Sequence, residues 1–397
     1  MPSKPLAEIA APTAGELRAV FDAPSELTVG LEEEVMLLDP ETLDLAPRAA
    51  EVLAALGDDT RFKAELPAAQ LEILTPPLAR VREAVEVLAA GRRRLGEVAG
   101  PGLVRAGAAG VHPFAAARGV LHGGERYDGI RAEYGPVAER QLVGGLQVHV
   151  AVRPADRALA VYNALRSYLP ELAALAANAP FYEGADSGLA SVRPLVSGML
   201  PRQGVPPAIP SWETWVEALR WGAAAGGVPE ARRWWWELRP HPAYGTLEVR
   251  VPDAQVTVAD AAAVAALIHA LVGRLAARYD AGEELAVAPS WRIAENRWSA
   301  CRHGLSGRLA DLATGDPVST RDRLRSLLEE LEPAAGALGC ASELREAGRL
   351  VEDGGAERQR AVAAERGIRG LTEWLAESFL AESAGDPPPR LRAGEAG

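Results

Sequence analysis

The sequence contains the segment Thr28-Val29-Gly30-Leu31-Glu32-Glu33-Glu34-Val35-Met36-Leu37, which sets three consecutive carboxylates into an apolar run. The apolar residues predict a β-strand, in which successive side chains point to opposite faces. Glu32 and Glu34 then share one face, and Glu33 points to the other. Two carboxylates on one face of an apolar strand must be neutralised, and a divalent cation can neutralise both. A solvated edge strand is the alternative for this segment taken alone.

Three later segments also place polar side chains among apolar ones. In the segment 65–74, Glu65 and Glu72 stand next to or among apolar residues. In the next segment, Gln147 and His149 alternate with Leu146, Val148 and Val150. In the third, 246–251, Glu248 and Arg250 share one face. A single strand histidine is more often structural, but four such strands together predict one polar cavity lined by a sheet. Carboxylates with one histidine and no thiolate suit magnesium or manganese better than zinc.

Composition fits a soluble enzyme. With 397 residues, 48% of them hydrophobic, the chain can bury a large core as one large domain or two tightly fused ones. A net charge of -12 argues against a nucleic-acid partner. Two cysteines are too few for a disulfide framework, and we recognise neither a secretory leader nor an apolar run that approaches a membrane span. We therefore expect a cytoplasmic protein without a membrane partner.

The order of the expected elements indicates an α+β fold, with strands and helices in the first two thirds and only helices beyond Ser290. We expect an N-terminal extension over 1–25, a single domain over 26–384, and a disordered tail over 385–397. The expected helices cover 48–56, 78–98, 156–178, 211–224 and 258–279, and a strand pair covers 234–239 and 246–251.

Three common motifs are missing from the sequence. It has no GxxxxGK[ST] loop, no GxGxxG after a strand and no GxSxG elbow. A metal–phosphate site on an antiparallel sheet remains. Because only Lys4 and Lys63 are lysines, binding of phosphate would fall to arginines or to Lys63.

Several motifs together resemble the bacterial type-2 glutamate-cysteine ligase family, also called carboxylate-amine ligases, over about residues 26 to 380. Their order and spacing carry the resemblance, rather than any single motif. The matching segments are Gly30-Leu31-Glu32-Glu33-Glu34, Gln70-Leu71-Glu72 with Thr75-Pro76-Pro77, Gly110-Val111-His112-Pro113-Phe114, Arg126-Tyr127, Arg140-Gln141, Val148-His149-Val150, Asp186-Ser187-Gly188 with Arg193, Trp236-Glu237-Leu238-Arg239-Pro240, Leu247-Glu248-Val249-Arg250 and Glu295-Asn296-Arg297-Trp298.

The resemblance implies a fold similar to the catalytic domain of glutamine synthetase and guanidino kinases, in which a curved antiparallel sheet with flanking helices carries ATP and Mg²⁺ or Mn²⁺. It also implies an ATP-dependent ligase that joins a carboxylate to an amine through an acyl phosphate, with glutamate and cysteine as default substrates. Such a site needs metal ions to bridge phosphates and arginines to hold the charge that develops during transfer. The implied partners are small amino acids and amines, and a homo-oligomer stays open.

The resemblance also implies roles for individual residues. The metal ligands would be Glu32, Glu34, Glu65, Glu72, His149 and Glu248. Arg250, Arg193 and Arg239 would be the catalytic arginines that hold phosphate or substrate carboxylates, and Arg250 and Glu34 would contact the nucleotide. Tyr127, Gln141 and Gln147 would line the substrate pocket. His112, before Pro113, is expected to shape its loop rather than to react.

One departure concerns the amine substrate. The family often has a cysteine or a second histidine just before the imidazole, whereas this chain reads Gly144-Gly145-Leu146-Gln147-Val148-His149. The amine therefore stays open, and so do three function classes: the ligase, a metal-dependent amide hydrolase, and a catalytically silent member that binds a metabolite. Arg250 and Arg193 beside the acids favour phosphate handling, and the retained acids argue against a silent member.

Overall fold

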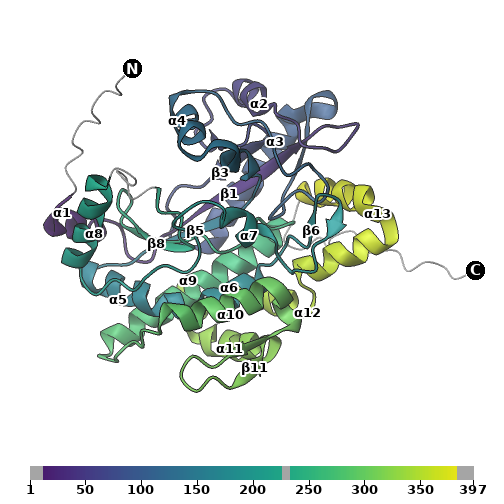
Figure 1. Cartoon of the computed structure of the whole chain (residues 1–397). Coiled ribbons are helices and arrows are strands. Elements are labelled where there is room, and N and C mark those ends of the chain that lie inside the picture. The colour runs from purple at the N-terminus through teal and green to yellow at the C-terminus, as the bar shows by residue number, and fades with distance from the viewer. Residues whose placement is uncertain (1–11, 226–232, 382–397) are drawn as a thin grey trace, which may run out of the picture.

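A seven-stranded antiparallel sheet flanked by helices forms the centre of the protein in a computed structural model, which describes residues 12–225 and 233–381 (Figure 1). The order across the sheet is β2-β3-β1-β5-β9-β8, and β4 pairs with β1 off this path. The strands are β1 (Val29–Leu38), β2 (Phe62–Ala64), β3 (Gln70–Leu74), β4 (Arg105–Gly107), β5 (Leu146–Ala151), β8 (Leu238–His241) and β9 (Thr246–Val249). Two further hairpins are β6 (Phe181–Tyr182) with β7 (Ala185–Asp186) and β10 (Arg308–Ala310) with β11 (Pro317–Ser319).

Helices follow or separate these strands, and the last third of the described chain is mainly helical. They are α1 (Ala14–Asp22), α2 (Ala49–Leu56), α3 (Val81–Leu103), α4 (Glu125–Tyr134), α5 (Ala155–Leu165), α6 (Leu169–Leu175), α7 (Arg193–Ser197), α8 (Trp212–Ala224), α9 (Val258–Asp280), α10 (Ser290–His303), α11 (Thr320–Leu338), α12 (Ala341–Glu352) and α13 (Gly355–Phe379). Short 3-10 turns cover Gly135–Arg140, Arg166–Tyr168 and Gly304–Ser306. The predicted fold class, an α+β protein built on an antiparallel sheet with C-terminal helices, is confirmed.

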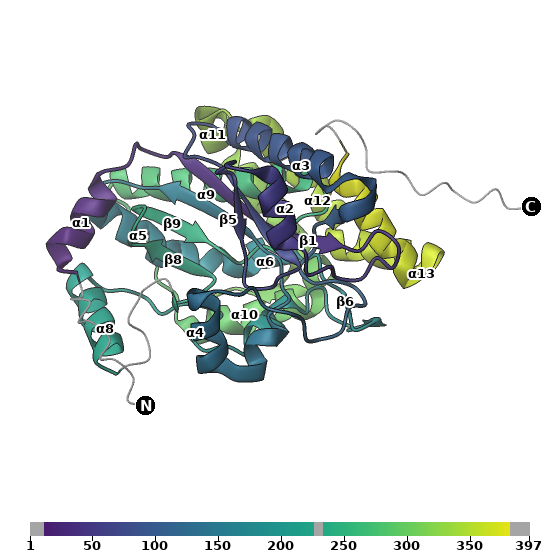
Figure 2. The ribbon, with the colours of Figure 1, turned by 90° about the horizontal axis from the view of Figure 1, so that it is seen from above.

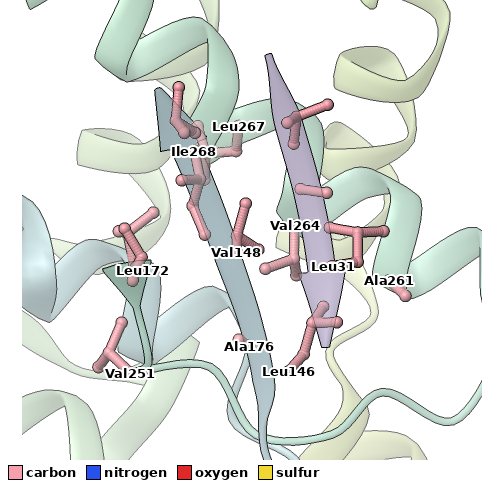
Figure 3. Close-up of a cluster of buried hydrophobic side chains, with 14 of the residues drawn as sticks. Leu31, Leu146, Val148, Leu172, Ala176, Val251, Ala261, Val264, Leu267 and Ile268 are labelled. Atoms are coloured by element: carbon pink, nitrogen blue, oxygen red, sulfur yellow. The ribbon is translucent and has the colours of Figure 1, made fainter. Parts of the chain in front are cut away.

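One face of the sheet is apolar because the side chains of each strand alternate between its two faces. Leu31, Val148 and Leu146 on this face are buried and pack toward Val264 and Ile268 of α9 (Figure 3). Figure 2 shows α3 and α9 on one side of the sheet and α4 beyond the other. The hydrophobic core therefore lies between the sheet and α9, and the opposite face of the sheet is left for polar residues.

Helix α9 is long and apolar enough to cross a membrane by length and composition, whereas the sequence pattern had predicted no such span. Of its most apolar window, however, 89% is buried inside the protein. Burial against the sheet explains its composition, because the core helix of a large domain must be apolar on most sides.

Glu33, the middle residue of the three glutamates, points into the apolar layer as the alternation predicted. Its carboxylate is fully buried and accepts hydrogen bonds from Nε of Arg92 on α3, at 2.8 Å, and from Nη2 of the same guanidinium. Arg92 also donates to the carbonyl oxygens of Gln255 and Val256 at 2.8 and 2.9 Å. This ion pair joins β1 to α3 and to the chain before α9.

The structure corrects several expected boundaries. The helix expected over 156–178 is interrupted by a 3-10 turn at Arg166–Tyr168, after which α6 begins with Pro170 in its first turn, where a proline is tolerated. The strand expected at 234–239 begins only at Leu238, and its partner ends at Val249. The region beyond Ser290 is not all helical, because β10 and β11 form a hairpin.

The predicted domain boundaries stay predictions. Within the expected extension of residues 1–25, α1 contributes Leu17 and Phe21 to the main core, and the Phe21 ring lies 4.9 Å from that of Trp212 on α8. The expected tail over 385–397 lies outside the described residues.

Candidate active site

The polar face of the sheet carries the predicted site residues in cross-strand rows. One row consists of Gly30, His149, Glu248 and Arg239, on β1, β5, β9 and β8. In another row, Lys63, Glu72 and Glu34 stand on β2, β3 and β1. Antiparallel pairing thus gathers residues from distant parts of the sequence on one surface.

Glu32, His149 and Glu248 form one possible metal-binding group. One ligand atom from each lies within 4.8 Å of the others. Nδ1 of His149 lies 2.9 Å from the hydroxyl of Thr246, and its Nε2, which is 3.5 Å from Glu32 Oε1, is buried without a hydrogen-bond partner. The hydroxyl fixes the ring orientation, and an unpartnered imidazole nitrogen beside two carboxylates fits a bound cation.

Glu34, Glu65 and Glu72 form a second group, in which one oxygen from each residue lies within 4.8 Å of the others. Burial, together with the charge of Glu34, raises the pKa of Glu65 to about 7. Burial and the charge of Glu65 raise the pKa of Glu72 well above its ordinary value, and burial also raises the pKa of Glu34. Three carboxylates this close need protons or a cation.

The chemistry of these two groups fits a divalent metal. Five carboxylates and one imidazole supply hard oxygen ligands with a single nitrogen, which suits Mg²⁺ or Mn²⁺. All six residues predicted as metal ligands lie in the two groups, which the structure places next to each other on the sheet. The identity of the ions, Mg²⁺ or Mn²⁺, stays a prediction.

Two arginines neutralise Glu248. Arg239 donates to it through Nε and, at 3.1 Å, through Nη2, and Arg250 donates through Nη1. Burial alone would raise the pKa of Glu248, but the charges of Arg239 and Arg250 hold it well below its ordinary value. The predicted side-by-side placement of Glu248 and Arg250 is therefore present, and Arg239 on the neighbouring strand joins them.

Gln147 lies between the two groups and is not part of the lining of the two cavities described below. Its side-chain nitrogen donates to Glu34 Oε1 at 3.0 Å, and its side-chain oxygen accepts from Nη1 of Arg250. Both ends of the amide are thus occupied by protein groups. Its contacts link a metal-group carboxylate to an arginine, and the predicted role of Gln147 in a substrate pocket stays a prediction.

A cavity of about 480 Å³ opens over the Glu34 group, between the sheet and α4, α7 and α10. Among the predicted residues, its lining includes Glu34, Glu65, Arg193, Arg250, Tyr127 and Gln141. The Tyr127 hydroxyl donates to the carbonyl of Ala64 at 2.9 Å, and the Gln141 amide donates to that of Val196 at 3.2 Å. These two contacts fix the side chains in the wall.

Arg193 enters this cavity from the first turn of α7. Its guanidinium donates to the carbonyl oxygens of Arg250 at 3.2 Å and Val251 at 3.3 Å, and Nη1 lies 3.7 Å from Asp253. A Cβ atom on Gly145 would stand 2.4 Å from Nη2 of Arg193. The amide of Gly145 also donates to Glu34 Oε2 at 2.7 Å. The guanidinium therefore passes close over Gly145, and a larger residue there would have to displace it.

A second cavity of about 770 Å³ opens over the Glu32 group at the other end of the polar face. Glu32, His149 and Lys63 supply its polar end. Its other walls are mainly apolar or uncharged and include Val20, Pro24, Leu74, Pro77 and Tyr244. The sequence alone did not predict which elements form the other walls of either cavity.

Sequence reasoning missed one buried ion pair in the first cavity. Arg297 donates through Nε to both carboxylate oxygens of Glu237 at 2.9 Å, and its Nη2 lies 2.7 Å from Oε1. Trp235 and Trp298 line the same cavity nearby. Both partners of the pair lie in motifs that carried the resemblance, but 60 residues separate them, and only the fold brings them together.

His112 makes contacts that fit its expected role in shaping its loop. Its ring contacts the Leu43 carbonyl and accepts hydrogen bonds from two loop amides.

Comparison with known proteins supports the family resemblance over most of the chain. The model of "Glutamate-cysteine ligase family 2 (GCS2)" matches residues 28–376. A Rubrobacter xylanophilus protein with the name "Putative glutamate--cysteine ligase 2-3" is 41% identical over 90% of this chain and 98% of its own length. A Thermobifida fusca protein named "Putative glutamate--cysteine ligase 2" is 34% identical over 91% of this chain and 93% of its own.

Two solved structures share the fold at low sequence identity. A glutamate–cysteine ligase from Francisella tularensis, solved in complex with AMP, gives a TM-score of 0.66 at 13% identity and covers 91% of both chains. A bifunctional glutathione synthetase from Pasteurella multocida gives 0.62 at 16% identity, over 93% of this chain and 54% of its own. The matches confirm the predicted class, an ATP-dependent carbon–nitrogen ligase similar to glutamate-cysteine ligases, and the chain belongs to glutamate-cysteine ligase family 2.

Proposed function

We propose that this protein uses ATP and a divalent metal to activate the side-chain carboxylate of an amino acid, by default glutamate, as an acyl phosphate, which an amine then attacks to form an amide. The observation that carries the proposal is the position of the two possible metal-binding groups. They lie side by side on one face of the sheet, and each opens into a different cavity. A phosphoryl group held between them would have one substrate on each side.

The charges in the two cavities suggest which substrate each would hold. The first cavity contains the guanidinium groups of Arg126, Arg193 and Arg250, which suit the carboxylates of an amino acid, and Glu65, which suits an ammonium group. The second cavity has Lys63 beside Glu32 and His149 at one end and mainly apolar walls beyond. The uncharged nucleoside part of ATP, with its flat base, fits the apolar end while the phosphates of the nucleotide reach the metal-binding groups.

The six residues would hold the metal ions, which would supply positive charge to neutralise the phosphates of the nucleotide. Arg250 lies beside both groups, because its guanidinium donates to Glu248 of the first and to Gln147, whose amide donates to Glu34 of the second. A guanidinium in this position can neutralise the charge that develops on the transferring phosphoryl oxygens. An amino acid bound in the first cavity would cover Glu34, Glu65 and Arg250, which line it, and would limit the access of water to the acyl phosphate.

A metal-dependent amide hydrolase is the second candidate, since clustered acids and a metal can also activate water. Arg193 and Arg250 beside the acids favour phosphate handling instead. The test is ADP release with amino acids and amines supplied singly and in pairs, with and without Mg²⁺. We expect full turnover only with metal, carboxylate and amine together. Full-rate ATP hydrolysis without a carboxylate substrate would overturn the ligase mechanism.

A further inference from the structure

Tyr244 is an exposed aromatic residue in the lining of the second cavity. It lies in the turn between β8 and β9, and 52% of the residue is exposed. Its ring stacks on that of His241, with centroids 4.2 Å apart and an interplanar angle of 8°. His241 is buried and does not contribute to the wall of this cavity. One side of the Tyr244 ring is therefore supported by the protein, while the residue itself borders the cavity.

Helix α1 holds this turn in place. Gly245, next to Tyr244, has a φ angle of +65°, and a Cβ atom there would stand 2.2 Å from the carbonyl oxygen of Val20. The turn thus packs directly on the C-terminal end of α1. The helix is anchored in turn, because Phe21 is buried against Trp212 and the Asp22 carboxylate accepts a hydrogen bond from the Ala155 amide at 2.8 Å.

The same part of the chain builds a wall of the cavity. Val20, Ala23, Pro24 and Ser25 line it opposite the strand residues. These residues precede residue 28, where the match to the family model begins. This wall is consequently a feature of the present chain that the family match does not cover.

We infer that Tyr244 is the stacking platform for the base of the nucleotide, and that α1 determines the specificity of this end of the site by fixing the Tyr244 turn and closing the cavity. The inference rests on the proposed function, which places the nucleoside in the second cavity. It adds the residues that contact the base. A supported aromatic ring beside apolar walls recognises a flat heteroaromatic ring by stacking, whereas phosphates are recognised at the Lys63 and Glu32 end.

The experiment compares two probes in the presence of Mg²⁺: a non-hydrolysable ATP analogue and inorganic tripolyphosphate, which lacks base and ribose. Calorimetry would give the dissociation constant of each. Tyr244→Ala should weaken the ATP analogue by ~10-fold or more, as expected for losing a stacked base, and leave tripolyphosphate unchanged. Tyr244→Phe should bind both probes normally. Trp291→Ala, at an exposed tryptophan outside the cavity lining, is the matched control.

A Gly245→Ala variant tests the role of α1, because the added methyl group must push the turn away from Val20. We expect the same selective loss of the ATP analogue. Equal weakening of both probes by Tyr244→Ala, or no effect on either, would overturn the inference while leaving the proposed function intact. If the Gly245→Ala variant bound both probes as tightly as the unaltered protein does, the inferred role of α1 would be wrong. If the unaltered protein binds neither probe with Mg²⁺, the proposed function itself fails.

Discussion

Glu34 and Glu72 stand directly opposite each other on β1 and β3. Like charges at such a position destabilise a sheet, and Glu65 brings a third carboxylate within reach of both. The protein can relieve this repulsion by taking up protons or by binding a cation. Its stability without metal should therefore depend on pH in a direction set by these acids.

The first prediction concerns Glu65. Its pKa is about 7 in the folded protein against an ordinary value of 4.5, so the folded state binds this proton more tightly than the unfolded chain. The free energy of unfolding without metal should fall as pH rises from 4.5 through 7. In Glu65→Gln, this decline in the free energy of unfolding should be smaller by on the order of 2 kcal/mol. The value is less than the whole pKa difference would give, because Glu65 keeps some contact with solvent. Urea unfolding at several pH values, with chelator present, measures it.

Magnesium provides the control for that measurement. With Mg²⁺ bound, the carboxylates can stay ionised, and the unfolding free energy at pH 7.5 should rise with metal concentration. A variant whose pH dependence matched that of the unaltered protein would show that Glu65 is not the titrating group.

The second prediction separates the middle glutamate from its neighbours. Arg92→Leu should lower the free energy of unfolding by about 3–5 kcal/mol, because it leaves the Glu33 carboxylate buried without its partner. A Glu33→Leu/Arg92→Leu double variant should recover much of that loss. Equal stability of the single and double variants, by chemical denaturation, would speak against a structural pair.

The third prediction contrasts two metal-group acids. Glu32→Gln should abolish turnover and change the melting temperature without metal only slightly, since its partly exposed carboxylate has a long 3.5 Å contact with His149. Glu248→Gln should also abolish turnover, but it should cost about 3–5 kcal/mol of stability, because the buried Glu248 carboxylate is the ion-pair partner that Arg239 and Arg250 share. Normal specific activity per folded molecule in either variant would assign that residue a structural role only.

The fourth prediction concerns Arg250. Arg250→Lys should lower the catalytic rate by ~10² or more, because an ammonium group does not replace a planar donor aimed at a transition state. Metal affinity should change little. If Arg250 served only as the ion-pair partner of Glu248, the lysine variant would keep most of its turnover, so steady-state kinetics with metal affinity measured in parallel decides between the two roles.

Much of the site could be predicted from local sequence because strand alternation is a strong rule. The two-residue spacing of Glu32 and Glu34, and of Glu248 and Arg250, is sufficient to place each pair on one face of its strand. The sequence alone did not explain why glycines stand at positions 144 and 145, and the structure does. A Cβ on Gly144 would stand 2.7 Å from the Ala109 carbonyl, and the neighbouring position is occupied by Arg193.

Features that depend on long-range pairing could not be predicted from sequence. Arg92 gives no sign that it partners Glu33, 59 residues away, and the Glu237–Arg297 pair depends on how α10 packs. The β10–β11 hairpin was missed because its strands have three residues each, although Thr314-Gly315-Asp316 between them is a turn signal, with Gly315 at a φ of +85°.

The central claim is that the carboxylate is activated by phosphorylation, and oxygen-isotope transfer tests it most directly. Glutamate labelled with ¹⁸O in its side-chain carboxylate would be turned over with ATP, Mg²⁺ and each of a panel of amines, and the phosphate released would be analysed by mass spectrometry. Formation of an acyl phosphate and attack by the amine leave one labelled oxygen in the amide and transfer the other to phosphate. We predict one ¹⁸O atom in each phosphate released with an accepted amine. Amide formation accompanied by unlabelled phosphate would contradict the mechanism.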